Sequence, residues 1–146
     1  MTGTCRHKYT RVLDKCYYVS TTKLTRDKGQ QKCQEDNARL AEPTSLAQLD
    51  ALRMWVVGGC YDLGAYIYLG YNRKRDSTIT ELTTTVDKFN TTIDFYYSNG
   101  SLVEFNVWRD WMTSPFDHCM FISHNCSGDL NCDLLYRYIC ETKLIT

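Results

Sequence analysis

The chain of 146 residues is as long as one ordinary domain, and its 43% of hydrophobic residues is enough for a packed core. Its 17 basic and 17 acidic residues give a net charge of zero at pH 7. This balance argues against a nucleic-acid-binding protein and a peptide for anionic membranes, because both depend on charge of one sign. No apolar run approaches the roughly 20 residues that cross a bilayer. These figures predict one soluble domain, residues 1–146.

Eight cysteines are far more than a cytosolic chain of this length usually carries. They form no C-x-x-C pair and no H-x-x-x-H cluster occurs, which argues against a structural zinc site. An even number of well-spread cysteines favours four disulfides made in an oxidising compartment. Three N-x-S/T sequons, at Asn90, Asn99 and Asn125, favour glycosylation and secretion. The start has no apolar leader, so we interpret it as a mature secreted chain with Met1 added for expression.

The first third of the chain predicts a strand followed by a helix. Residues 17–19 have strand composition. Residues 25–36 predict the helix. Thr25 can cap its start, Asp27 suits its first turn, and Asn37 can end it in the left-handed conformation.

A second helix is predicted after Pro43, which stops the preceding segment. It opens at Ser45, where the run SLAQ fits a capping box. Its apolar face, at helical spacing, consists of Leu46, Leu49, Leu52 and Val56.

Beyond the second helix, the pattern predicts short strands. Residues 66–71 are a continuous buried-strand run, and residues 95–97 lead into the hairpin-turn signal SNGS at 98–101. Two further strands are predicted at 119–122 and 136–140. A strand, two helices and then several short strands predict an α+β domain stapled by disulfides.

Several motifs follow one another in an order that is typical of one known family. Cys5 and Cys16 match a short amino-terminal hairpin, and the run CQEDNARLA at 33–41 matches a first helix and the segment after it. The L-G pair at 69–70 matches the end of a W-I-G-L core strand, and FYYSNG at 95–100 matches a W-x-W-x-D-G turn. In this order and spacing, the chain resembles the long form of the C-type lectin-like domain.

The resemblance implies disulfide pairings that spacing alone cannot give, since eight cysteines allow many connectivities. The implied pairs are Cys5–Cys16, Cys33–Cys140 and Cys119–Cys132. It also implies an α+β fold with two helices packed on short-stranded antiparallel sheets and with the two termini close together. Cys60 and Cys126 lie outside the family set. They either pair within the chain or bond between chains, which would make a covalent homodimer.

An insertion at residues 72–94 is longer than the family needs at this point. Its threonine-rich stretch at 78–86 has strand composition and predicts an added hairpin, with a ligand or partner surface as the alternative. The basic triplet at 73–75 predicts a solvated turn, with a contact to sulfated glycans as the alternative.

The family's calcium site is largely missing from this chain. The resemblance implies calcium ligands from an E-P-N or Q-P-D motif, an acid before a framework cysteine, and a W-N-D motif. Asp117 and Asp129 retain two carboxylates, but Ser127 and Gly128 replace the tryptophan and asparagine of W-N-D. The run RDW at 109–111 stands in the E-P-N position, so that the positive charge of Arg109 lies where the family has a ligand oxygen. Calcium takes six to eight oxygen ligands, so neither a metal nor any other cofactor is expected.

The expected ligand site is the loop before Cys119, which combines aromatic and polar side chains. Aromatic faces stack on sugar C–H surfaces, and arginine and carboxylates hydrogen-bond hydroxyl groups. The candidate ligand-binding residues are Arg109, Asp110, Trp111, Phe116, Asp117, His118 and Asp129. The Glu42-Pro43 pair imitates part of the calcium motif but is far from this loop in the sequence.

Two classes of function remain open at this stage. One is a secreted lectin that recognises glycans without calcium, in innate defence or cell recognition. The alternative is a module that uses the same face to bind a cell-surface or secreted protein. Neither nucleic acid nor a membrane is expected as a partner. An enzyme is not expected either, because no G-x-S-x-G, P-loop or H-E-x-x-H motif occurs.

Overall fold

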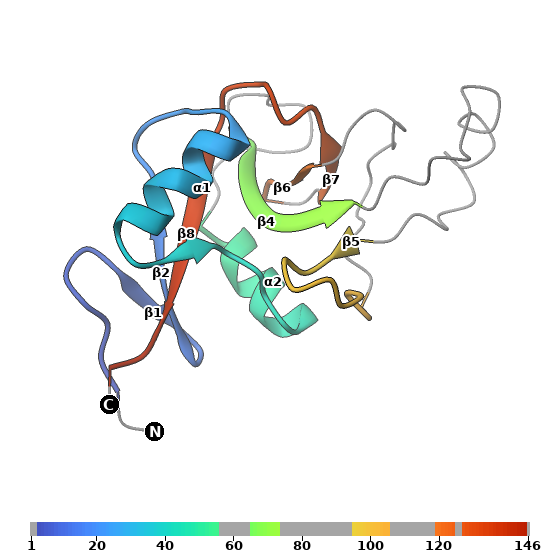
Figure 1. Cartoon of the computed structure of the whole chain (residues 1–146). Helices are drawn as coiled ribbons and strands as arrows, with labels where there is room; N and C mark the ends of the chain where they lie inside the picture. The colour runs from blue at the N-terminus through green and yellow to red at the C-terminus, as the bar shows by residue number, and fades with distance from the viewer. Residues whose placement is uncertain (1–2, 56–64, 74–94, 106–118, 125–126, 146) are drawn as a thin grey trace, which may run out of the picture.

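The computed structural model describes residues 3–55, 65–73, 95–105, 119–124 and 127–145 (Figure 1). This part of the chain holds two α-helices and eight β-strands. In chain order these are β1 (Thr10–Val12), β2 (Lys15–Val19), α1 (Arg26–Glu35), β3 (Arg39–Leu40), α2 (Leu46–Arg53), β4 (Ile67–Arg73), β5 (Phe95–Tyr96), β6 (Cys119–Ile122), β7 (Ser127–Leu130) and β8 (Arg137–Lys143). Neither of these helices is long and apolar enough to cross a bilayer. The predicted α+β class is confirmed.

The strands form one sheet in the order β1-β2-β8-β4-β6-β7, with β3 attached to β8 and β5 attached to β4. The predicted antiparallel pairing is found everywhere in the described sheet except between β4 and β8, which run parallel. A parallel pair needs a long crossover, and here the chain passes through β5, β6 and β7 before it returns. The strand nearest the C-terminus therefore lies in the middle of the sheet.

Alternation along the strands divides the core into two layers, one on each face of the sheet. In β6, Met120 and Ile122 join the layer that contains Leu49 and Leu52 of α2. Cys119 and Phe121 join the other layer, which contains Cys33 of α1. The two helices therefore cover opposite faces of the sheet, and the strands between them are buried on both sides.

The first helix begins and ends as predicted. The Thr25 side chain accepts a hydrogen bond from the Lys28 N–H, and Asn37 takes the left-handed conformation with φ of 55°. Gly29 is buried, and a Cβ there would lie 3.1 Å from the Tyr138 ring. The absence of a side chain at Gly29 thus lets α1 pack closely on β8.

The second helix is capped by Ser45, which accepts a hydrogen bond from the Gln48 N–H at 3.1 Å. Its predicted apolar face is correct for Leu49 and Leu52 but wrong for Leu46, which is 46% exposed. Gln48 and Arg53 are buried as well. With 100° of rotation per residue, the mean direction of the four buried side chains lies about 90° around the helix axis from Leu46. Val56 lies outside the described residues.

The three disulfides implied by the resemblance are present: Cys5–Cys16, Cys33–Cys140 and Cys119–Cys132. The Cys33–Cys140 bond spans 107 residues and joins α1 to β8, so it constrains the unfolded chain most, by about 4–5 kcal/mol in the chain-entropy model. Cys60 and Cys126 lie outside the described residues. Their pairing therefore stays a prediction.

The two ends of the described chain meet, as expected for this fold. Thr4 and Ile145 exchange two backbone hydrogen bonds, of 3.0 and 2.8 Å, and Figure 1 shows both termini at the same end of the molecule.

The predicted turn after β5 is also found, with φ of 92° at Gly100. Asn72 and Arg73, placed in the insertion from sequence, are the end of β4, and residues 74–94 lie outside the described part.

Gly70 of β4 lies where two segments of backbone cross closely. Its N–H donates to the Ala41 carbonyl at 2.8 Å. A Cβ on Gly70 would lie 2.8 Å from the Leu40 carbonyl oxygen and 2.9 Å from Cγ of Glu42. Backbone cannot give way as a flexible side chain can, so any side chain at this position must displace β3 from the sheet.

We therefore expect Gly70→Ala to lower the free energy of unfolding by about 1–3 kcal/mol, the usual cost of overpacking. Urea denaturation measures this loss. An unchanged free energy of unfolding in Gly70→Ala would show that β3 can move away from the added methyl group at little cost.

Candidate functional site

The expected ligand-binding loop lies between two described anchors. Six of the seven candidate residues fall at 106–118, outside the described residues: Arg109, Asp110, Trp111, Phe116, Asp117 and His118. The seventh, Asp129, is described as a backbone position of β7 paired with Met120. The structure therefore describes the residues on either side of the loop, at 103–105 and in β6, together with the neighbouring strand β7. We call these residues the frame of the loop.

Both ends of the loop are held by buried residues. On its amino-terminal side, Val103 is buried and Phe105 packs against the same core layer. On its carboxyl-terminal side, Cys119 is fully buried, begins β6 and is bonded to Cys132. The ends of the loop are therefore fixed on the sheet.

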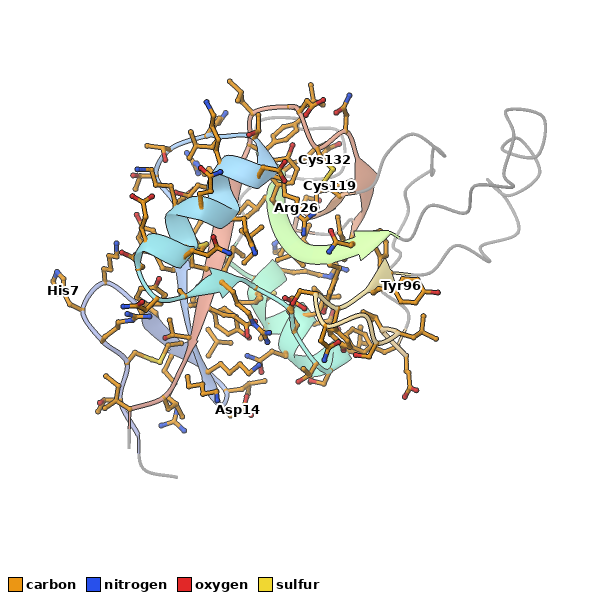
Figure 2. The ribbon with its side chains drawn as sticks, in the orientation of Figure 1. His7, Asp14, Arg26, Tyr96, Cys119 and Cys132 are labelled. Atoms are coloured by element: carbon orange, nitrogen blue, oxygen red, sulfur yellow. A yellow bond between two sulfur atoms is a disulfide. The ribbon has the colours of Figure 1, made fainter. Side chains whose placement is uncertain are left out.

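Arg26 joins the base of the loop to the base of the insertion. Its Nη1 donates to the Asn72 side chain and lies 3.8 Å from Sγ of Cys119, while Nη2 donates to the Gly70 carbonyl at 3.0 Å. Figure 2 shows Arg26 beside the Cys119–Cys132 disulfide. Arg26 thus links α1, β4 and β6 at the point where both segments leave the sheet.

The environment of Arg26 is unusual for a cation. Burial lowers the pKa of its guanidinium from the ordinary value, with the charges of Asp27 and Glu42 acting in the opposite direction. Its Nε is buried and has no hydrogen-bond partner among the described residues. We did not single out Arg26 from sequence. The available signal was a basic residue in the first turn of a helix, where the helix dipole disfavours positive charge.

The position of the family's W-N-D motif falls on β7. Ser127, at the tryptophan position, is fully buried and accepts a hydrogen bond from Nη2 of Arg53 at 2.6 Å. Gly128, at the asparagine position, pairs with Phe121 and has no side chain to offer a metal. No group of three metal-ligating side chains is found in the described part of the chain.

Arg53 brings a positive charge to this part of the frame. It is only 3% exposed, and its Nε lies 3.2 Å from Oδ1 of Asp50. The Arg53 guanidinium thus joins α2 to the first residue of β7 and has Asp50 as its counter-charge. Arg53 was not singled out from sequence, although it follows Leu49 by four residues and Leu46 by seven and so lies on the predicted apolar face of α2.

Glu42, excluded from sequence as a calcium ligand, has a structural role. It is 3% exposed, and its carboxylate accepts hydrogen bonds from the backbone N–H of Ser98 at 2.8 Å and the Ser98 hydroxyl at 2.7 Å. The following residue, Pro43, accepts a hydrogen bond from the Tyr71 hydroxyl. The segment after β3 therefore holds the turn after β5, which leads toward the loop.

Of the three sequons, one lies in the described part of the chain. Asn99 is exposed at the turn after β5, and its Oδ1 accepts hydrogen bonds from the Ser101 N–H and hydroxyl at 2.9 and 2.6 Å. Asn90 and Asn125 lie outside the described residues. Glycosylation at all three stays a prediction.

Glu42→Ala removes the acceptor for two hydrogen bonds from Ser98 and leaves the Ser98 N–H without its partner. We expect a loss of about 1–3 kcal/mol in unfolding free energy, since two hydrogen bonds to a charged, buried acceptor are lost. Glu42→Gln retains an acceptor oxygen for the Ser98 N–H and should lose less. Chemical denaturation compares the two variants, and equal losses would mean that the carboxylate's charge, rather than the bond to Ser98, holds the turn.

Comparison with solved structures finds the same fold in several proteins. The calcium-independent type II antifreeze protein has a TM-score of 0.72 at 19% identity, covering 99% of this chain and 98% of that one. The carbohydrate-recognition domain of the mouse scavenger receptor C-type lectin has a TM-score of 0.72 at 18% identity, covering 95% and 98%. The C-type lectin domain of murine dendritic cell inhibitory receptor 2, in complex with N-glycan, has 0.69 at 15% identity, covering 96% and 99%.

No curated protein matches the chain significantly. The family model for the lectin C-type domain matches residues 22–142. This match covers most of the chain and includes both helices, β8 and the long Cys33–Cys140 disulfide. The family is generally non-enzymatic. The chain belongs to the C-type lectin domain family.

Proposed function

We propose that this chain is a secreted lectin domain that recognises glycans through the loop at 106–118 and needs no calcium to do so. The observation that carries the proposal is the frame of the loop. Both ends of the loop are held by buried residues, while Gly128 takes the place of a calcium ligand in β7. The frame thus supports a presented loop and leaves the usual metal site short of ligands.

Relatives of the same fold support a glycan as the ligand class. One is a carbohydrate-recognition domain and another is in complex with N-glycan. Others are antifreeze proteins, so the fold also serves other ligands. The composition of this loop favours sugars: Trp111 and Phe116 would stack on pyranose C–H faces, and Arg109 would hydrogen-bond hydroxyl or acetamido groups.

Extracellular location is part of the same proposal. The six cysteines in the described residues are all disulfide-bonded, and such bonds persist in oxidising compartments. Asn99 lies on an exposed turn, where a glycan could be attached without unfolding the sheet. A role in innate defence or cell recognition follows from a secreted lectin.

A glycan array tests the ligand class. We expect the chain to bind a defined set of glycans equally well with calcium and with a chelator. Trp111→Ala should abolish this binding while leaving the unfolding midpoint unchanged, because the substitution removes a stacking surface from the loop. Leu135→Ala is the control, since Leu135 is 60% exposed and lies in the turn between β7 and β8.

If no glycan on the array is bound, either with calcium or with the chelator, the glycan proposal is overturned and a protein ligand for the same loop is favoured. Binding that Trp111→Ala leaves intact would place the glycan elsewhere on the molecule. Binding that the chelator abolishes would contradict only the calcium independence.

Calcium independence has a separate test in thermal unfolding. A ligand that binds only the native state raises the unfolding midpoint, so we expect no rise on adding millimolar calcium in place of chelator. Asp117 and Asp129 alone would leave most of the six to eight coordination positions to water. A calcium-dependent rise that Asp129→Ala abolishes would show that a metal site exists.

A further inference from the structure

A groove of about 620 Å³ lies along β8, on the side of the molecule where the termini meet. It is distinct from the loop frame, since Figure 2 shows Cys119 and Cys132 at the far end of the molecule from Asp14, the neighbour of Lys15 in this groove. Four basic side chains line it: Arg6, Lys15, Arg39 and Lys143. Glu141 is the one carboxylate among its lining residues. A cavity of this size accommodates an oligosaccharide or a drug-sized ligand rather than a single small ion.

The groove lies where β8 extends beyond the short strand β3. The two-residue strand β3 pairs with β8 only at Glu141 and Cys140. Beyond that point β8 continues through Thr142 and Lys143, next to Asn37 and Ala38 of the segment that precedes β3. The groove follows this stretch of β8.

The carboxylate of Glu141 is fully used within the protein. It is 4% exposed and accepts from Lys15 at 3.1 Å, from Arg39 at 3.1 and 3.2 Å, and from the Glu42 N–H at 2.6 Å. One buried acceptor thus fixes two cations at the floor of the groove, and Glu42 lies 3.8 Å from Arg39 as a second counter-charge.

The other two basic side chains of the groove, Arg6 and Lys143, make no ion pair among the described residues. Lys143 is exposed, makes no ion pair there, and lies directly opposite Lys15 in the pairing of β2 with β8. Like charges at directly opposed positions destabilise a sheet. Arg6 donates to the Asn37 carbonyl and packs over the Tyr9 ring, with no carboxylate partner in the described chain. The groove therefore carries a net positive charge although the whole chain is neutral.

We propose that this groove binds a linear sulfated glycan. Guanidinium groups match the geometry of sulfate oxygens, and lysines add point charges along the same line. A stiff sugar chain with recurrent sulfates engages several cations at once and loses little conformational entropy, whereas a flexible acidic peptide loses more. The disulfides favour a compartment in which sulfated polysaccharides, rather than nucleic acids, are the available polyanions.

This site is independent of the loop proposed above, and one binding experiment tests it. Binding of a heparin octasaccharide to the full chain is measured by isothermal calorimetry over a series of NaCl concentrations. Wild-type protein should bind, and its affinity should fall linearly on a double-logarithmic plot against salt, as expected when cations displace counterions from a polyanion. Fully desulfated octasaccharide should not bind.

Lys143→Ala combined with Arg6→Ala should weaken binding about tenfold and reduce the salt slope by about two, one for each lost contact. The matched control is Lys23→Ala combined with Lys28→Ala, which removes the same charge from exposed positions outside the groove lining. The control should change affinity less than twofold. Lys143→Glu alone should weaken binding without lowering the unfolding midpoint, because it puts an opposite charge directly across from Lys15.

Four outcomes would overturn the proposal. Wild-type protein could fail to bind the octasaccharide. The control pair could weaken binding as much as the groove pair, which would mean a diffuse attraction. Poly-glutamate could bind as tightly, which would make the groove a site for acidic peptides. Trp111→Ala could abolish octasaccharide binding, which would place the sulfated chain at the loop and leave the groove without a ligand.

Discussion

The Cys33–Cys140 disulfide ties the first helix to a strand that lies in the middle of the sheet, and the other elements are arranged around that strand. Residues of β8 pair with β2, β3 and β4 and pack beneath Gly29 of α1. Because β8 comes from the end of the described chain, neither the β1–β2 hairpin nor β4 has its central neighbour until that segment is in place. The disulfide offsets the entropy of closing this long loop, which is the largest that a described disulfide closes.

A second constraint is the buried carboxylate of Glu141 in the same strand. Its bonds to Lys15, Arg39 and the Glu42 N–H join β2, β3 and the segment after β3. Glu42 in turn binds Ser98 in the turn after β5. A chain of buried polar contacts thus runs from the groove near the termini to the hairpin that leads into the loop. Burying a carboxylate is costly unless it is paired and hydrogen-bonded, and both carboxylates meet that condition.

The frame of the loop retains the strand architecture at the position of the family's W-N-D motif, although the side chains there differ. Ser127 and Gly128 still take their places in β7, paired with Ile122 and Phe121. The side-chain oxygen of an asparagine is absent at Gly128, and the Ser127 hydroxyl is engaged by Arg53. Backbone pairing does not depend on the side chain, so β7 forms with these residues in place. Positive charge from Arg53 and Arg26 now lies in the frame that carries the loop.

The sequence by itself determined the elements whose signals are local. Thr25 and Ser45 cap their helices, Asn37 ends the first, and short runs of strand composition identify several strands, because these signals depend on neighbouring residues only. The disulfide pairs came from the family resemblance. Tertiary structure alone decided that β4 and β8 run parallel, that Leu46 faces solvent, that Arg53 is buried and that the Arg26 guanidinium bonds to β4. It also brought Arg6, Lys15, Arg39 and Lys143 to one groove. These features join residues far apart in the chain, and local patterns carry no information about such contacts.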